Sequence, residues 1–149
     1  MEAKFLMATS AEAPRADTVR IGELDLRFLI SDPGATVFEC MIPSGARVPA
    51  PHFHRDADET LYGLNGTLTV TLGGEARLLQ PGEAVFIPRG VVHHHENKHM
   101  GDARFLAVLT PGSIGRSYFE EIADVINVPG RPDLAKAKEV MLRHGLVPV

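Results

Sequence analysis

Seven histidines stand out in this chain of 149 residues, because they are clustered rather than spread evenly. His52 and His54 form one pair, three more occupy positions 93–95, and His99 follows closely. Only His144 lies far from the others. Histidine is the commonest metal ligand and the side chain that titrates nearest neutral pH. Two clusters in one short chain therefore favour a chemical role over a set of unrelated surface side chains.

The first cluster has a spacing that suits a single ion. In an extended strand side chains alternate, so His52 and His54 point the same way while Phe53 points to the opposite face. At a rise of about 3.3 Å per residue, the two imidazoles lie roughly 6–7 Å apart and can converge on one ion. The short polar loop 55–58 lets the chain turn back, so that Glu59 can present its carboxylate to the same place.

The second cluster follows a run of turn residues, which place His93 at the start of another strand. Alternation then puts His95 and Asn97 on the face of His93. His95 therefore either lines the pocket beside His93 or replaces it if the register shifts. We expect His94 and His99 at the surface, and we expect Asn97 to hold backbone near the strand end.

The pattern of apolar runs and turns predicts the scaffold that must position these side chains. Short apolar runs are separated by turn signals, among which Asn65-Gly66 is the strongest short hairpin signal. Strands are expected at residues 23–30, 36–42, 61–64, 67–72, 76–79, 84–87, 91–97 and 104–109. Strands this short, without helical interruptions, predict an antiparallel sandwich or barrel.

The composition changes after Thr110-Pro111-Gly112. Apolar residues between 118 and 126 share one face of a predicted helix. A second helix is expected to begin near Pro132-Asp133 and to stop at Gly145. We expect one domain over residues 1–149, made of an N-terminal arm (1–18), a β-barrel (19–110) and a C-terminal helical extension (111–149).

Two spacing patterns resemble the signature motifs of the cupins. The first family motif is a glycine, a spacer of about five residues, His-x-His, a spacer of three or four residues, a glutamate, a spacer of six residues and a second glycine. The stretch from Gly45 through His52, His54 and Glu59 to Gly66 is similar to this motif, with one extra residue after Gly45. The second motif is matched without a gap by Gly82, Pro88, Gly90, His93 and Asn97. The resemblance covers about residues 20–110. It implies an all-β fold, the cupin double-stranded β-helix or jelly-roll barrel, here followed by a C-terminal pair of short α-helices.

The resemblance also implies metal ligands at His52, His54, Glu59 and His93. Three imidazoles and one carboxylate suit one divalent transition metal ion, and Fe, Mn, Ni, Co, Cu and Zn all remain possible. Four protein ligands leave one or two positions open for a substrate oxygen or dioxygen. Glu59 is expected either to stay a ligand or to leave the metal and act as a general base, as in some members of the family.

Four further residues are candidates for the pocket wall, namely His95, Gly63, Phe38 and Phe105. Gly63 either leaves room beside the metal or marks a bulge. Core packing is the default for the strand aromatics Phe38 and Phe105. Cys40 sits in mid-strand and is expected to be buried filler rather than a nucleophile.

A narrower similarity concerns the stretch from Thr110 to Phe119 and the two-helix tail, which resemble single-domain bacterial cupins described as quercetinase-like. That resemblance implies a metal-dependent dioxygenase of a small flavonol- or enediol-like substrate, with Glu59 taking the substrate's proton. A metal-dependent isomerase or lyase of a sugar or keto acid is the alternative, and it would need basic residues inside the barrel, for which Arg47, Arg55 and Arg89 are the candidates. A non-catalytic barrel that binds a small molecule is the third reading.

Charge and hydropathy exclude several partners. The formal net charge is -4, so an electrostatic attraction to nucleic acid or to anionic lipid is not expected. No apolar run approaches the 18 residues of a transmembrane helix, and a single cysteine, Cys40, suits a reducing compartment. We therefore expect a cytoplasmic protein with a small-molecule substrate. An N-terminal arm that could cross to a neighbour predicts a homodimer.

Overall fold

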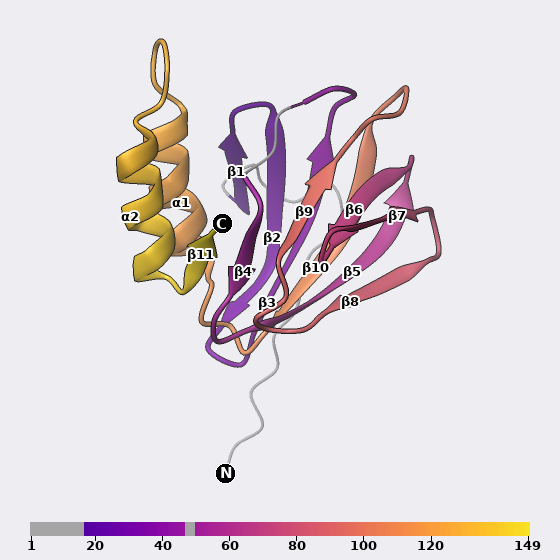
Figure 1. Cartoon of the computed structure of the whole chain (residues 1–149), viewed down its shortest axis with the longest axis horizontal. Helices are drawn as coiled ribbons and strands as arrows, with labels where there is room; N and C mark the ends of the chain where they lie inside the picture. Colours follow the sequence, from indigo (N-terminus) through magenta and orange to yellow (C-terminus); the bar gives the residue numbers. More distant parts are fainter. Residues whose placement is uncertain (1–16, 47–49) are drawn as a thin grey trace.

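The computed structural model describes residues 17–46 and 50–149, which form two antiparallel sheets packed face to face and two helices (Figure 1). The six-stranded sheet has the order β1 (Thr18–Ile21), β2 (Leu24–Asp32), β3 (Ala35–Ile42), β10 (Ala103–Thr110), β5 (Asp58–Asn65), β8 (Ala84–Ile87). The five-stranded sheet has the order β11 (Leu146–Pro148), β4 (His52–His54), β9 (His93–Glu96), β6 (Leu68–Leu72), β7 (Glu75–Leu79). The predicted all-β architecture, followed by two short C-terminal helices, is confirmed.

Alternation along the strands builds the core between the sheets. In β3 every second residue, from Thr36 through Phe38 and Cys40 to Ile42, is buried, while the residues between them are partly exposed. The same period of two runs along β10, where Ala103, Phe105, Ala107 and Leu109 are buried. A strand with one face in the core and one toward solvent shows this alternation. Cys40 belongs to this buried set, as its place in mid-strand predicted.

The helices α1 (Arg116–Ile126) and α2 (Leu134–Arg143) lie side by side on one flank of the sandwich, next to β1 and β11 (Figure 1). Asp133 caps α2, because its carboxylate accepts hydrogen bonds from the amides of Ala135 and Lys136 at 3.0 and 3.2 Å. Gly145 follows α2 with a φ of 81°, a conformation that favours glycine. The predicted start and stop of this helix are confirmed. Within the described part of the chain, neither helix is long and apolar enough to span a membrane.

The hairpin predicted at Asn65-Gly66 is wrong. The strands on either side, β5 and β6, belong to different sheets, so this turn carries the chain from one sheet to the other. Gly66 has a φ of 68°, and a Cβ there would lie 2.1 Å from the carbonyl oxygen of Asp102. The glycine therefore serves a tight turn and a close backbone approach. The glycine does not determine which strands pair, because both edges of β5 are occupied by other strands, β10 and β8.

The tail contains a strand that the sequence pattern did not predict. β11 pairs with β4, and its register places Leu146 opposite His54 and Pro148 opposite His52. The C-terminal segment therefore supports the strand that carries the first histidine pair. Three residues at the end of the chain are too few to show an alternating pattern, so no local signal marks this strand.

Candidate metal centre

Two neighbouring strands of the five-stranded sheet carry the histidines. β4 supplies His52 and His54, β9 supplies His93 and His95, and His52 lies directly opposite His93 in the ladder. His52, His54 and His93 are buried, with 9%, 4% and 1% of their surface exposed. Alternation explains why both members of each pair face the interior. The structure therefore brings together the two histidine clusters, which lie about forty positions apart in the chain.

The three rings of His52, His54 and His93 converge on one point. Their centroids lie 4.6–5.2 Å apart, and one nitrogen of each lies within 4.8 Å of the others. The Nε2 atoms of His52 and His54 are separated by only 3.2 Å. We call these three residues the three-histidine group.

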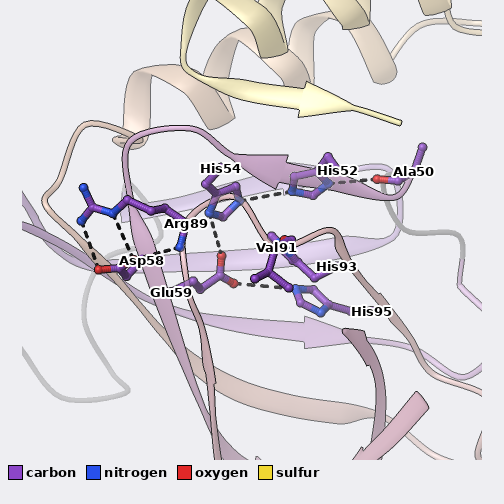
Figure 2. A network of polar contacts seen from close by, with 9 residues as sticks. All are labelled: Ala50, His52, His54, Asp58, Glu59, Arg89, Val91, His93 and His95. Atoms are coloured by element: carbon purple, nitrogen blue, oxygen red, sulfur yellow. Dashed lines mark hydrogen bonds and ion pairs between the residues drawn. The ribbon is translucent and has the colours of Figure 1, made fainter. Parts of the chain in front are cut away.

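Backbone carbonyls fix two of these rings. The Nδ1–H of His52 donates to the carbonyl of Ala50 at 2.9 Å, and that of His93 donates to Val91 at 3.0 Å (Figure 2). Such a bond sets the tautomer and leaves the Nε2 lone pair facing the centre, as in metal-binding histidines. The Nε2 of His93 is buried without a partner in the protein. A buried nitrogen of this kind calls for a ligand, so the residues present fit a metal ion.

Glu59 comes from the opposite sheet. The residue is 6% exposed, and its side chain points between two imidazoles (Figure 2). One carboxylate oxygen, Oε2, lies 3.7 Å from Nδ1 of His54, and the other, Oε1, lies 3.7 Å from Nε2 of His95. Glu59 forms a second group of possible ligands with His93 and His95. His93 therefore belongs to both groups.

Burial sets the protonation of the site. It lowers the pKa of His52, His54 and His93 from 6.5 to about 4, because a charged ring loses its water. Burial also raises the pKa of Glu59, but the contact with His95 and the neighbouring rings of His54 and His93 outweigh it and hold that pKa at about 2. At neutral pH the three rings are neutral and the carboxylate is ionised, which is the state a metal ion requires.

An exposed ion pair links the start of β5 to the turn that precedes β9. Arg89 precedes β9, and it donates to Asp58 from its amide at 2.9 Å and from Nε and Nη2 at 3.1 Å each (Figure 2). Asp58 is the neighbour of Glu59, and the amide of Gly90 donates to the carbonyl of His54 at 2.8 Å. The sequence did not predict this ion pair, because Asp58 and Arg89 are 31 positions apart and no local pattern relates them.

The candidate pocket residues separate into two sets. His95 and Phe105 lie at the site: their rings meet edge to face at 5.8 Å, and Phe105 is buried. Phe38 packs in an aromatic cluster with Phe28 and Phe119, whose ring centroids lie 5.4 and 5.0 Å from its own. A Cβ at Gly63 would lie 2.2 Å from the carbonyl oxygen of Gln80, so this glycine admits the backbone of the neighbouring turn.

Gly63 also lies beside a register irregularity. The pairing of β10 with β5 shifts between Arg104 and Phe105, whose partners are Asn65 and Gly63. An extra residue in one strand is the feature of a β-bulge, which was one of the two alternatives predicted for Gly63.

The remaining histidines and Asn97 have other partners. His94 lies 3.7 Å from Glu96, and His99 contacts Thr69 at 3.4 Å; both are half-buried rather than fully at the surface. Asn97 is buried, and its amide donates to the carbonyls of Ile42 and Gly101 at 2.9 Å each. Asn97 thus holds backbone, as predicted.

Among the described residues, the interior of the sandwich holds none of the basic side chains that an isomerase or lyase would need. Among residues 17–46 and 50–149, no lysine or arginine is buried. Arg55 is exposed beside Asp56, and Arg89 is engaged with Asp58. Arg47 lies outside the described residues. Nothing at the described site therefore supplies a cation for an anionic substrate.

Comparison with known proteins agrees with this architecture. Residues 38–109 match the family model described as a Cupin domain, and this stretch includes every candidate ligand. The chain therefore carries a cupin domain. It is 37% identical over 60 residues to the tetracenomycin polyketide synthase protein TcmJ of Streptomyces glaucescens, which is 40% of each chain. It is 30% identical over 83 residues to quercetin 2,3-dioxygenase of Bacillus subtilis, which is 55% of this chain and 23% of that protein.

The matches therefore span less than half of the length of these two relatives. Among solved structures, KdgF from Halomonas sp. is similar with a TM-score of 0.63 and 24% identity, over 72% of this chain and 94% of that one. At this identity the similarity shows the fold alone. The particular chemistry must be argued from the site.

Proposed function

We propose that this chain is a metal-dependent dioxygenase of a small oxygenated substrate of the flavonol or enediol type. The observation that carries the proposal is the convergence of three buried, neutral imidazoles on one point beside an ionised carboxylate. The similarity to quercetin 2,3-dioxygenase over 83 residues supports the type of reaction.

His52, His54 and His93 would hold one divalent transition metal ion through Nε2, with Glu59 as a fourth ligand or as a base beside it. Imidazole and carboxylate donors suit Fe, Mn, Ni, Co, Cu and Zn, and they do not choose among them. When bound, the ion would act as a Lewis acid toward substrate oxygens and bring dioxygen and substrate together. The orphaned Nε2 of His93 supports a ligand at this point.

Glu59 is the residue that moves a proton in this proposal. As an ionised carboxylate it accepts the proton of a substrate hydroxyl, which prepares the substrate for oxygen. Ile87 and Leu109 lie opposite Glu59 in the two neighbouring strands, and each is only 1% exposed. These apolar side chains limit the access of water to the carboxylate.

Oxygen consumption tests the proposal. The metal-free protein is loaded separately with each of the six metals and assayed with a panel of flavonols and enediols, with His93→Ala as the control that lacks a ligand. We expect oxygen uptake with at least one metal, and none by the control. If every loaded form is inert toward oxygen, the dioxygenase proposal is wrong, and a non-catalytic binding barrel becomes the better account.

We also propose that the protein is a cytoplasmic homodimer, and light scattering tests the mass. The N-terminal arm that suggested the dimer lies outside the described residues, apart from its last two positions. A monomeric mass in solution would contradict this part of the proposal.

A further inference from the structure

We propose that His95 is a positioning residue that holds Glu59 beside the three-histidine group rather than within it, so that a position on the metal stays open. The inference rests on the proposed function, and it addresses the two roles that the motif leaves open for Glu59. In this proposal Glu59 is a base that lies next to the ion without binding it.

The possible donor atoms of the site fall into two groups. His52, His54 and His93 each offer a nitrogen within 4.8 Å of the other two. Glu59 does not join that set; its carboxylate instead groups with His93 and His95. A point at bonding distance from the three rings is therefore displaced from the carboxylate, which faces His95.

The carboxylate of Glu59 lies between two imidazole rings. Each oxygen of Glu59 faces a different ring, Oε2 toward His54 and Oε1 toward His95, at 3.7 Å in both cases (Figure 2). This separation is within ion-pair range and longer than a hydrogen bond. If His54 turns Nε2 to the metal, its Nδ1–H faces the carboxylate. Glu59 is then bracketed by two N–H groups from two different strands.

A positioning residue must itself be held in place, and the surroundings of His95 meet this requirement. Its backbone pairs with Val70 of β6. Its ring lies 5.8 Å from that of Phe105 and 5.7 Å from that of His93. With its backbone in the sheet and its ring beside those of Phe105 and His93, His95 presents Nε2 to Glu59 at 3.7 Å.

Co²⁺ is the probe, because its visible absorption reports the coordination number. The variant His95→Phe removes the N–H and keeps a ring of similar size, and His95→Gln keeps an N–H donor. His94→Phe is the matched control, since His94 is the next residue on β9 and points to the opposite face. Circular dichroism melts check that each variant is folded.

In His95→Phe we expect Glu59 to join the ion. The Co²⁺ absorption should weaken as the coordination number rises, and Co²⁺ should bind about tenfold tighter, which is within the range by which groups behind the ligands alter affinity. His95→Gln and His94→Phe should keep the wild-type spectrum. An unchanged spectrum in His95→Phe overturns the inference. A loss of affinity as large as that of His93→Ala also overturns it, because His95 would then be a ligand itself.

Glu59→Gln tests the same inference without altering His95. If His95 holds Glu59 away from the ion, this variant keeps the Co²⁺ spectrum of the wild type; if Glu59 is already a ligand, the spectrum changes and the inference is wrong. These readouts are independent of turnover. A wild-type protein that binds Co²⁺ but takes up no oxygen with any metal overturns the dioxygenase proposal alone. An active wild type whose Glu59→Gln spectrum changes overturns only the role of His95.

Discussion

Two sets of closely packed rings in this protein differ in the partners that they need. In the aromatic cluster, Phe28, Phe38 and Phe119 lie with centroids 5.0–5.4 Å apart. In the three-histidine group the separations are similar, 4.6–5.2 Å. The packing distances are thus alike, and the chemistry of the ring edges is what distinguishes the two regions.

The aromatic rings satisfy one another, because phenyl edges and faces attract without any polar partner. The histidine rings leave buried nitrogens of His54, His93 and His95 without hydrogen bonds. A buried polar group without a partner destabilises the folded state. The first region therefore stabilises the fold, while the second lowers its stability until a bound ion gives the Nε2 atom of His93 a partner.

Among the single substitutions, the largest expected effect on stability comes from Phe38→Ala. Truncating this buried ring should lower the free energy of unfolding by about 3–5 kcal/mol, as measured by urea unfolding. Because the ring of Phe38 packs against Phe28 and Phe119, we expect an unchanged affinity for metal. A folded Phe38→Ala protein with much weaker metal binding would instead show that Phe38 belongs to the pocket.

The next effect concerns His93→Ala, measured by calorimetric titration with Zn²⁺. Because His93 belongs to both groups of donors, its loss should weaken binding by more than about 100-fold, since even residues behind the ligands cost about 10–100-fold. His94→Ala is the control on the same strand and should bind like the wild type. Equal binding by the two variants would contradict the assignment of the site.

Metal should stabilise the wild type. At a free metal concentration of 100 times Kd, an ion that binds only the folded state adds about 2.7 kcal/mol. Thermal melts with and without metal measure this gain. Phe38→Ala should show the same gain from a lower starting point, whereas His93→Ala should show none at the same concentration. A gain of equal size in both variants would remove the distinction between the two regions.

The last prediction concerns the pH dependence of the stability of the metal-free protein. Burial lowers the pKa of His52, His54 and His93 from 6.5 to about 4. Between these values the unfolded chain binds more protons than the folded one, so the free energy of unfolding falls as the pH falls from 6.5 toward 4. Glu59, with its pKa lowered from 4.5 to about 2, adds a further loss below pH 4.5.

Urea unfolding at pH 7, 6 and 5 measures that slope. His93→Phe removes one of the three titrating rings and should flatten it, while Phe38→Ala should shift the whole curve down without changing its slope. A wild-type protein equally stable at pH 7 and pH 5 would contradict the burial of neutral imidazoles.

Much of the fold follows from local patterns. Short apolar runs at 36–42 and 104–109 marked two central strands of the six-stranded sheet, and the turn at Gly73-Gly74 joins β6 and β7 in a true hairpin. The Asn65-Gly66 turn was misinterpreted, because the same local chemistry serves a hairpin and a crossing between sheets. β11 was missed for a related reason: its partner, β4, lies about ninety residues earlier in the chain.

The amino-acid sequence alone determined which side chains could bind a metal and that each histidine pair would share one face of a strand, because side-chain direction depends on backbone geometry over two residues. Only the tertiary structure decided that β4 and β9 are neighbours, that Glu59 reaches the histidines from the opposite sheet, and that His95 faces it. These are contacts between segments distant in the chain. These contacts form because the two sheets pack together, and local backbone preferences do not determine that packing.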